Sequence, residues 1–184
     1  MIKLNSKSKK LLLLQRNELL TKTQNLIRKK FGRFLFTNFF INFFQNKNIE
    51  KITEELFLKE LETFKHFLPN SAKNIMDIGC GLGIINICLN KFFEKKSTFF
   101  LIDKNRIDKK INYGFSSNYE SYNDLNETKN ILLENNVDSE RIYLFDVEKQ
   151  FQINKKMDLV ISLKSMGYHY PINTYIELFK NCCT

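Results

Sequence analysis

The sequence has few of the residues that hold metal ions or form disulfides. Its 184 residues include four cysteines and two histidines, and no two cysteines stand in a Cys-x-x-Cys pair. Structural zinc sites usually take cysteine and histidine ligands at such short spacings. A metal site is therefore not expected, and a reducing, cytoplasmic location fits the cysteine content best.

Long hydrophobic runs are also lacking. The run FLFTNFFINFF at residues 34–44 is much shorter than the roughly 20 residues that a membrane-spanning helix needs. The LLLL run at 11–14 follows a basic start but is too short for the core of a signal peptide. Neither a membrane span nor a secretion signal is expected.

Glycine and proline are scarce, with six and two residues, whereas Asn, Lys, Ile and Phe are abundant. This bias indicates coding from an AT-rich genome, which raises the lysine content by itself. The net charge of +9 is for that reason a weak sign of nucleic-acid binding. The hydrophobic content of 43% is enough for the core of one ordinary domain.

The positive charge lies almost entirely in residues 1–33, which hold ten basic residues and one acid, whereas residues 34–184 hold 19 of each. Apolar pairs in this segment recur every seven residues, at Leu12/Leu13, Leu19/Leu20 and Leu26/Ile27. The spacing predicts a helix with one apolar stripe among lysines. This basic arm either packs on the domain or binds an anionic surface, which would be RNA or a membrane leaflet.

Residues 34–70 are expected to form a helical extension. The run at 34–44 is apolar nearly all round, so it should be buried. Residues 48–68 repeat apolar positions at helical spacing, and Pro69 and Asn70 end the pattern.

Beyond residue 70 the pattern predicts strands that alternate with helices. Strands are expected at 74–79, 97–103, 141–146 and 157–163, and helices at 84–93, at 123–136 and from Pro171 onward. Such alternation implies an α/β fold with a doubly wound, mostly parallel sheet. Residues 71–184 would form this domain.

The sequence DIGCGLG at 77–83 joins the first strand to its helix. Glycines in such a turn let the backbone approach a ligand closely, and the helix start offers free amide groups. The dinucleotide fingerprint needs its third glycine at position 84, which is Ile84 here. The pattern Asp-x-Gly-x-Gly-x-Gly instead resembles the first motif of the class I S-adenosylmethionine-dependent methyltransferases.

This resemblance implies a Rossmann-like methyltransferase fold with S-adenosylmethionine as cofactor. It assigns the methionine ammonium to Asp77, directly or through water, and gives Gly79 and Gly81 the role of making room. Cys80 and Gly83 complete the part of the turn that the cofactor would contact.

Two further acids end the next two predicted strands. Asp103 stands 20 residues beyond Gly83, a suitable place for accepting hydrogen bonds from both ribose hydroxyls, with Lys104 beside it. The resemblance implies that Asp146 accepts a hydrogen bond from the adenine amino group and that Val147 lines the base. Three acids at three consecutive strand ends are a stronger sign of a cofactor site than one glycine turn.

The segment SLKSMGYHYP at 162–171 follows the fourth strand, where ligand contacts are usual in such sheets. It has neither the Asn/Asp-Pro-Pro-aromatic sequence nor the Pro-Cys of methyltransferases that act on nucleic-acid bases. His169 is the candidate general base toward a substrate hydroxyl, because its ordinary pKa is close to neutral, although a structural loop histidine fits the position as well. Candidate acceptor contacts are Ser165, Tyr168, Tyr170 and, from an insertion at 105–122, Tyr113.

The expected function is methyl transfer to a small-molecule hydroxyl, for example on a sugar. The stretches 106–125 and 165–178 resemble a group of small uncharacterised methyltransferases of bacterial and viral origin, which supports such an acceptor. Two alternatives stay open. One is an RNA methyltransferase that uses the basic arm, and the other is a non-catalytic module that binds the cofactor or a partner.

The resemblance covers about residues 74–181. Methyltransferases of this class continue with a fifth strand and a hairpin, for which the sequence has no room after the last helix. The expectation is a sheet without its last strands, whose fourth strand is an exposed edge. Three explanations are open: the sequence is a fragment of a longer chain, a partner chain completes that edge, or the amino-terminal helices cover it.

Overall fold

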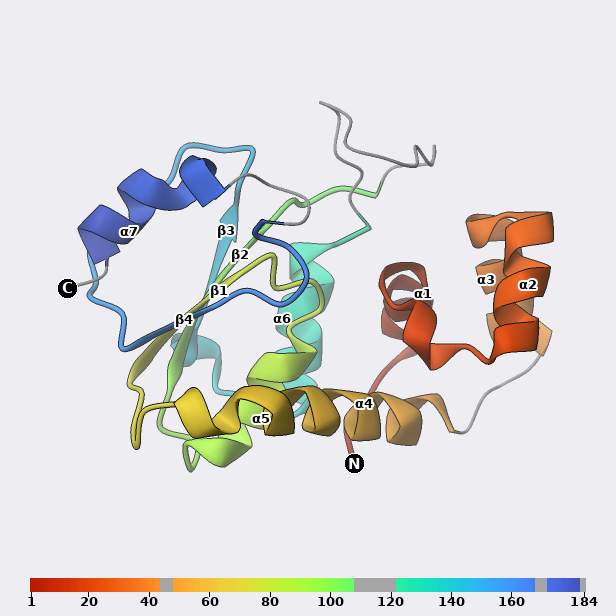
Figure 1. Cartoon of the computed structure of the whole chain (residues 1–184), viewed down its shortest axis with the longest axis horizontal. Coiled ribbons are helices and arrows are strands. Elements are labelled where there is room, and N and C mark those ends of the chain that lie inside the picture. Colours follow the sequence, from red (N-terminus) through yellow and green to blue (C-terminus); the bar gives the residue numbers. More distant parts are fainter. Residues whose placement is uncertain (44–47, 108–121, 168–171, 183–184) are drawn as a thin grey trace.

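The protein is described by a computed structural model that covers residues 1–43, 48–107, 122–167 and 172–182. Its centre is a sheet of four parallel strands in the order β3-β2-β1-β4 (Figure 1). The strands are β1 (Asn74–Ile78), β2 (Thr98–Asp103), β3 (Ile142–Asp146) and β4 (Leu159–Ile161). The predicted α/β architecture with a parallel sheet is confirmed, and the arrangement is compatible with a Rossmann-like fold.

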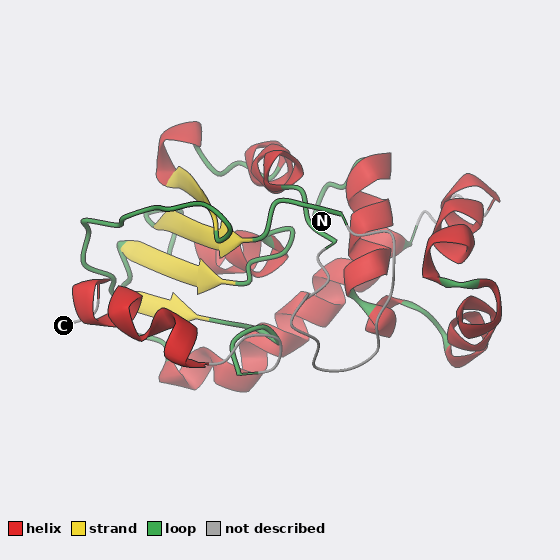
Figure 2. Ribbon diagram, turned by 90° about the horizontal axis from the view of Figure 1, so that it is seen from above, coloured by secondary structure: helices red, strands yellow, loops and turns green. Residues whose placement is uncertain are grey.

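Alternate residues of the strands enter two separate hydrophobic clusters, one on each face of the sheet. In β1, Ile75 packs on the side of α4 (Ile49–Phe64), α5 (Ile84–Phe92) and α6 (Leu125–Glu134), whereas Met76 and Ile78 pack on the side of α7 (Ile176–Cys182) (Figures 1 and 2). The segment 147–158 between β3 and β4 has no helix and lies on the α7 side. Both faces of the sheet are therefore covered, as a parallel sheet requires.

The amino-terminal 20 residues are part of the main core. Asn5 caps α1 (Ser6–Gln15) by accepting from the amides of Lys7 and Ser8. Ile2 and the four leucines 11–14 are buried in the same cluster as the sheet. Arg16 then pairs with Glu60 of α4 at 2.8 Å. The first half of the predicted basic arm is thus anchored to the domain.

The prediction of one helix with a continuous apolar stripe is wrong. The helix breaks after Gln15, and a new helix, α2 (Lys22–Phe31), begins at a capping box in which Thr21 and Gln24 exchange hydrogen bonds. Leu19 and Leu20 are buried, but Leu26 and Ile27 are exposed. Local capping therefore overrides the seven-residue spacing.

The run at 34–44 is also only partly buried, contrary to expectation. It forms most of α3 (Arg33–Phe43), where Phe36 and Phe40 are buried while Leu35 and Phe39 are exposed. The helical extension is otherwise as predicted, with α4 ending before a short 3-10 turn at Lys65–Phe67.

The fourth strand is shorter than predicted, three residues instead of seven. Chain reversal starts at Ser162, whose hydroxyl donates to the carbonyl of Ile78 and accepts from the amide of Met166. Lys164 takes a left-handed φ of 60°. Within the described residues β4 pairs with β1 alone, and the helix expected from Pro171 begins as a 3-10 turn at Ile172–Tyr175.

Candidate functional site

The glycine turn follows β1 directly, and all three of its glycines have left-handed φ angles. The values are 73° at Gly79, 54° at Gly81 and 69° at Gly83, the residue that precedes α5. Only glycine adopts this region at low cost. The amides of Gly79 and Cys80 both donate to the carbonyl of Ile102, at 2.7 and 3.2 Å, and tie the turn to β2.

Protein atoms fill the space that a side chain would need at each of these glycines. A Cβ on Gly79 would overlap the side chain of Ser165, and one on Gly81 would lie 2.9 Å from Oε1 of Gln15. At Gly83 the nearest atom would be a methyl carbon of Thr128, at 3.2 Å. Internal packing therefore accounts for the missing side chains, and a ligand would have to meet the turn from another side.

Asp77 is the acid next to this turn, and it is buried, with 1% of its surface exposed. Its Oδ2 accepts a hydrogen bond of 2.6 Å from the amide nitrogen of Asn86 in α5. Burial raises the pKa of Asp77 to about 7; the Asn86 hydrogen bond opposes that rise and the charge of Asp103 adds to it. Oδ1 of Asn86 is buried and has no hydrogen-bond partner among the residues that the structure describes.

Asp103 lies at the carboxyl end of β2. Its Oδ2 accepts from the amide of Gly81 at 2.6 Å, and its Oδ1 accepts from its neighbour, the amide of Lys104, at 2.7 Å. Burial raises the pKa of Asp103 to about 6 against the effect of these two bonds. The second predicted acid therefore holds the glycine turn in place.

Asp146 ends β3 in register with Asp103. Its Oδ1 accepts from the amide of Glu148 at 3.1 Å, and the amide of Val147 donates to the carbonyl of Asp103 at 3.0 Å. The side chain of Lys104 is buried against this region, with its Nζ 3.4 Å from Oε1 of Glu148. The parallel register thus brings the predicted residues of β2 and β3 side by side.

The remaining predicted residues divide into two groups. Cys80 is buried, and burial raises the pKa of its thiol well above the usual value, which disfavours the thiolate. Ser165 is also buried, against Gly79. The candidate base and three candidate acceptor contacts lie outside the described residues: His169, Tyr113, Tyr168 and Tyr170.

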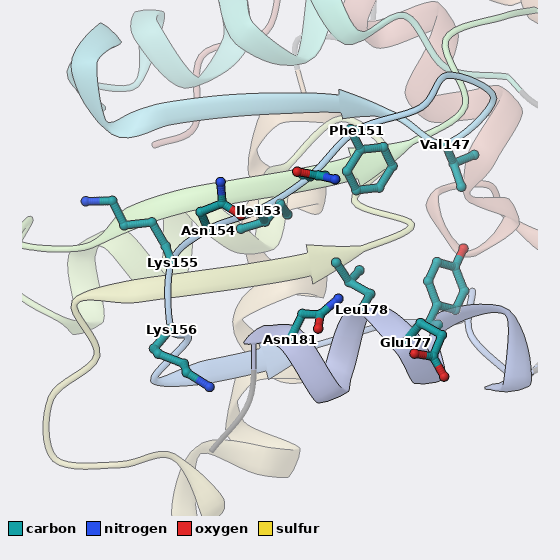
Figure 3. A pocket seen from close by; sticks show the side chains of 11 residues that line it. Val147, Phe151, Ile153, Asn154, Lys155, Lys156, Glu177, Leu178 and Asn181 are labelled. Carbon is teal, nitrogen blue, oxygen red and sulfur yellow. The ribbon is translucent and has the colours of Figure 1, made fainter.

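A groove with a volume of about 740 Å³ lies between the segment 147–156 and α7. This volume is within the range of small-molecule sites. Figure 3 shows Val147 near the carboxyl ends of the strands, with Lys155 and Lys156 toward the opposite end. The lining is mixed: Phe151, Ile153, Leu178 and Tyr175 supply apolar surface, and Gln152, Asn154, Glu177 and Asn181 supply polar groups. Sequence reasoning assigned only Val147 of this group.

Sequence reasoning also missed the residues that hold the glycine turn from other elements. The side chains of Asn123 and Thr128 donate to the carbonyl of Gly81, at 2.9 and 2.8 Å. Gln15 packs on Gly81 from the amino-terminal helix. Asn86 is the one residue with a local signal, because it is a polar residue in an otherwise apolar first helical turn.

No protein-family model matches the chain, and no curated protein matches it significantly. Within residues 1–43, 48–107, 122–167 and 172–182, no helix has the combined length and hydrophobicity that a membrane crossing needs. The Cys, His, Asp and Glu residues in that part of the chain form no group of three or more suited to a metal ion.

Proposed function

We propose that this protein binds S-adenosylmethionine at the carboxyl ends of β1, β2 and β3 and transfers its methyl group to a hydroxyl of a small molecule. The observation that supports this most is the grouping of Asp77, Asp103 and Asp146 beside a turn of three left-handed glycines. Ligands of parallel α/β sheets bind at this edge.

The chemistry of the buried acids suits a ligand with a positive group. Asp77 and Asp103 have pKa values near neutrality, of about 7 and about 6, because burial disfavours their charged forms. A ligand ammonium would favour the ionised carboxylates. Asp103 accepts from the backbone amides of Gly81 and Lys104 and from the side chain of Asn123, whereas a carboxylate accepts about four hydrogen bonds in total. Acceptor capacity for about one ribose hydroxyl therefore remains, and a second hydroxyl would have to replace one of these bonds.

The cofactor, when bound, would supply an already activated methyl group. The chain's own task is then to hold the acceptor and to exclude water. Val147 and the end of the groove that begins there would accommodate the base beside Asp146. Ser165, which touches Gly79, places the segment after β4 against the cofactor turn, so acceptor contacts are proposed on that side. Proton removal by His169 remains a prediction.

A second candidate is a module that binds a partner or the cofactor without catalysis. The internal packing at Gly79, Gly81 and Gly83 favours it, because that packing explains the glycines without any ligand. The hydrogen bond between Asn86 and Asp77 likewise gives the first acid a structural partner.

Calorimetric titration of the full chain with S-adenosylmethionine and S-adenosylhomocysteine tests the proposal. The variant Asp103→Asn keeps the shape of the side chain but removes its charge, and Glu140→Gln removes an exposed carboxylate elsewhere on the chain. We expect both ligands to bind the wild type and the control equally. We expect Asp103→Asn to bind them about 10- to 100-fold more weakly, because charge-assisted hydrogen bonds are lost.

The titration separates a cofactor-binding protein from a module that binds only a partner, and an assay of methyl transfer separates the enzyme from a module that binds the cofactor without catalysis. Equal binding by Asp103→Asn and the wild type would place the cofactor elsewhere and refute the proposed site. Absence of binding by a wild-type chain that unfolds cooperatively on heating would refute the enzyme and leave the partner-binding module. Far-ultraviolet circular dichroism of each variant shows whether it is folded.

A further inference from the structure

Helix α2 attaches to the rest of the protein through its polar side. Arg28 is buried, with 6% of its surface exposed, and its guanidinium donates to the carbonyl of Leu13 at 2.7 Å and to the side chain of Asn17. Asn25 donates to the carbonyls of Asn17 and Leu20 at 3.1 and 3.2 Å. An amphipathic helix usually packs on the protein through its apolar side, whereas α2 packs through these polar side chains.

As a result, large apolar side chains of α2 and its neighbour α3 face outward. The two helices are joined by Gly32 and pack against each other at the end of the molecule that is farthest from the sheet (Figures 1 and 2). The exposed fractions are 66% for Leu26, 42% for Ile27, 59% for Phe31, 71% for Leu35 and 53% for Phe39. We call these five residues the tip surface. Several large apolar side chains exposed on neighbouring helices are typical of an interaction site.

The tip surface is accompanied by positive charge without any acid. Residues 22–43 contain five basic residues and no Asp or Glu. Lys22, Lys29 and Lys30 are exposed, and within the described residues none of the three has an acidic partner. Basic residues around exposed leucine, isoleucine and phenylalanine are the pattern of helices that lie in a membrane interface.

We propose that α2 and α3 bind the surface of an anionic lipid bilayer, with the tip surface entering the headgroup region and the three lysines contacting anionic headgroups. RNA would pair with the lysines and could stack on Phe31 and Phe39, but it would leave Leu26, Ile27 and Leu35 without an apolar partner. A second copy of the chain would cover the apolar side chains but would bring like charges together. An anionic bilayer accommodates both the apolar side chains and the lysines. The proposal is independent of methyl transfer.

Flotation with lipid vesicles tests this proposal on the full chain. One set of vesicles is phosphatidylcholine alone, and the other contains phosphatidylserine as about a third of the lipid. We expect binding to the second set only, weakened by salt. The double variant Lys29→Gln/Lys30→Gln should bind about 25-fold more weakly, at about fivefold for each lysine. The double variant Lys155→Gln/Lys156→Gln loses the same charge away from the tip surface and should bind as the wild type does.

A second pair of variants tests the apolar contribution. Leu35→Ser, on the tip surface, should weaken vesicle binding about 10-fold or more. Phe67→Ser removes a side chain that is 79% exposed elsewhere and should have no effect. Both positions are exposed, so both variants should fold.

Three outcomes would overturn the proposal. They are equal binding to both sets of vesicles, binding to a single-stranded RNA oligomer without binding to vesicles, and a dimer in light scattering that Leu35→Ser dissociates while vesicles are not bound. Loss of cofactor binding in the titration described above would leave the proposal unaffected.

Discussion

Replacing Asp77 with asparagine should stabilise the protein at neutral and alkaline pH. Burial raises the pKa of Asp77 in the folded chain from its ordinary value near 3.8 to about 7. A raised pKa means that the folded state holds its proton between about pH 4 and 7, whereas the unfolded state has lost it. The free energy of unfolding should therefore fall as the pH rises through this window.

The magnitude follows from the size of the shift. The rise of the pKa from its ordinary value near 3.8 to about 7 corresponds to about 4 kcal/mol for Asp77, at about 1.36 kcal/mol for each factor of ten in proton affinity. Asparagine cannot ionise, and its side-chain oxygen can still accept from Asn86. Relative to the wild type, Asp77→Asn should thus gain about 4 kcal/mol of unfolding free energy between about pH 4 and pH 8.

Urea denaturation at several pH values across that range measures this gain, with Glu140→Gln as a control that loses an exposed carboxylate. The control should follow the wild type at every pH. A wild type that becomes more stable as the pH rises, or an Asp77→Asn variant without any relative gain, would refute the reasoning, because Asp77 would then be ionised in the folded chain.

Two further predictions concern the glycine turn and the thiols. Gly79→Ala should lower the unfolding free energy by about 2 to 4 kcal/mol, because its Cβ overlaps Ser165 at a left-handed φ. In urea denaturation, Gly167→Ala, at a left-handed φ of 77° where the nearest atom would be 3.9 Å from the added Cβ, should cost only about 1 kcal/mol; an equal loss for both would exclude the overlap as the cause. Cys80 and Cys88 should resist iodoacetamide in the native chain and react in urea, because burial raises their thiol pKa values, that of Cys88 to about 11. Peptide mass spectrometry detects the alkylation, and native labelling of Cys80 would show that the turn opens.

The arrangement of strands and helices could be predicted from the sequence because hydrophobic periodicity and turn residues act locally. The alternation after residue 70 predicted four parallel strands, and the Gly-x-Gly-x-Gly spacing predicted the turn that joins β1 to α5. The juxtaposition of Asp103 and Asp146 followed from parallel topology alone, since carboxyl ends of parallel strands share one edge.

The contacts between distant segments could not be predicted in this way. No local pattern indicates that Gln15 packs on Gly81, or that Asn123 and Thr128 hold its carbonyl. The orientation of α2 was also missed, because the hydrogen bonds of one buried arginine, Arg28, decide it. Leu26 and Ile27 of α2 keep the predicted apolar spacing, but both side chains face solvent.

A crystal structure of the full chain soaked with S-adenosylhomocysteine tests the central claim most directly. We expect density for the ligand across the carboxyl ends of β1, β2 and β3, with the ribose hydroxyls at Asp103 and the base at Asp146 and Val147. An empty edge under saturating ligand, or density only at the lysine end of the groove between 147–156 and α7, would contradict it.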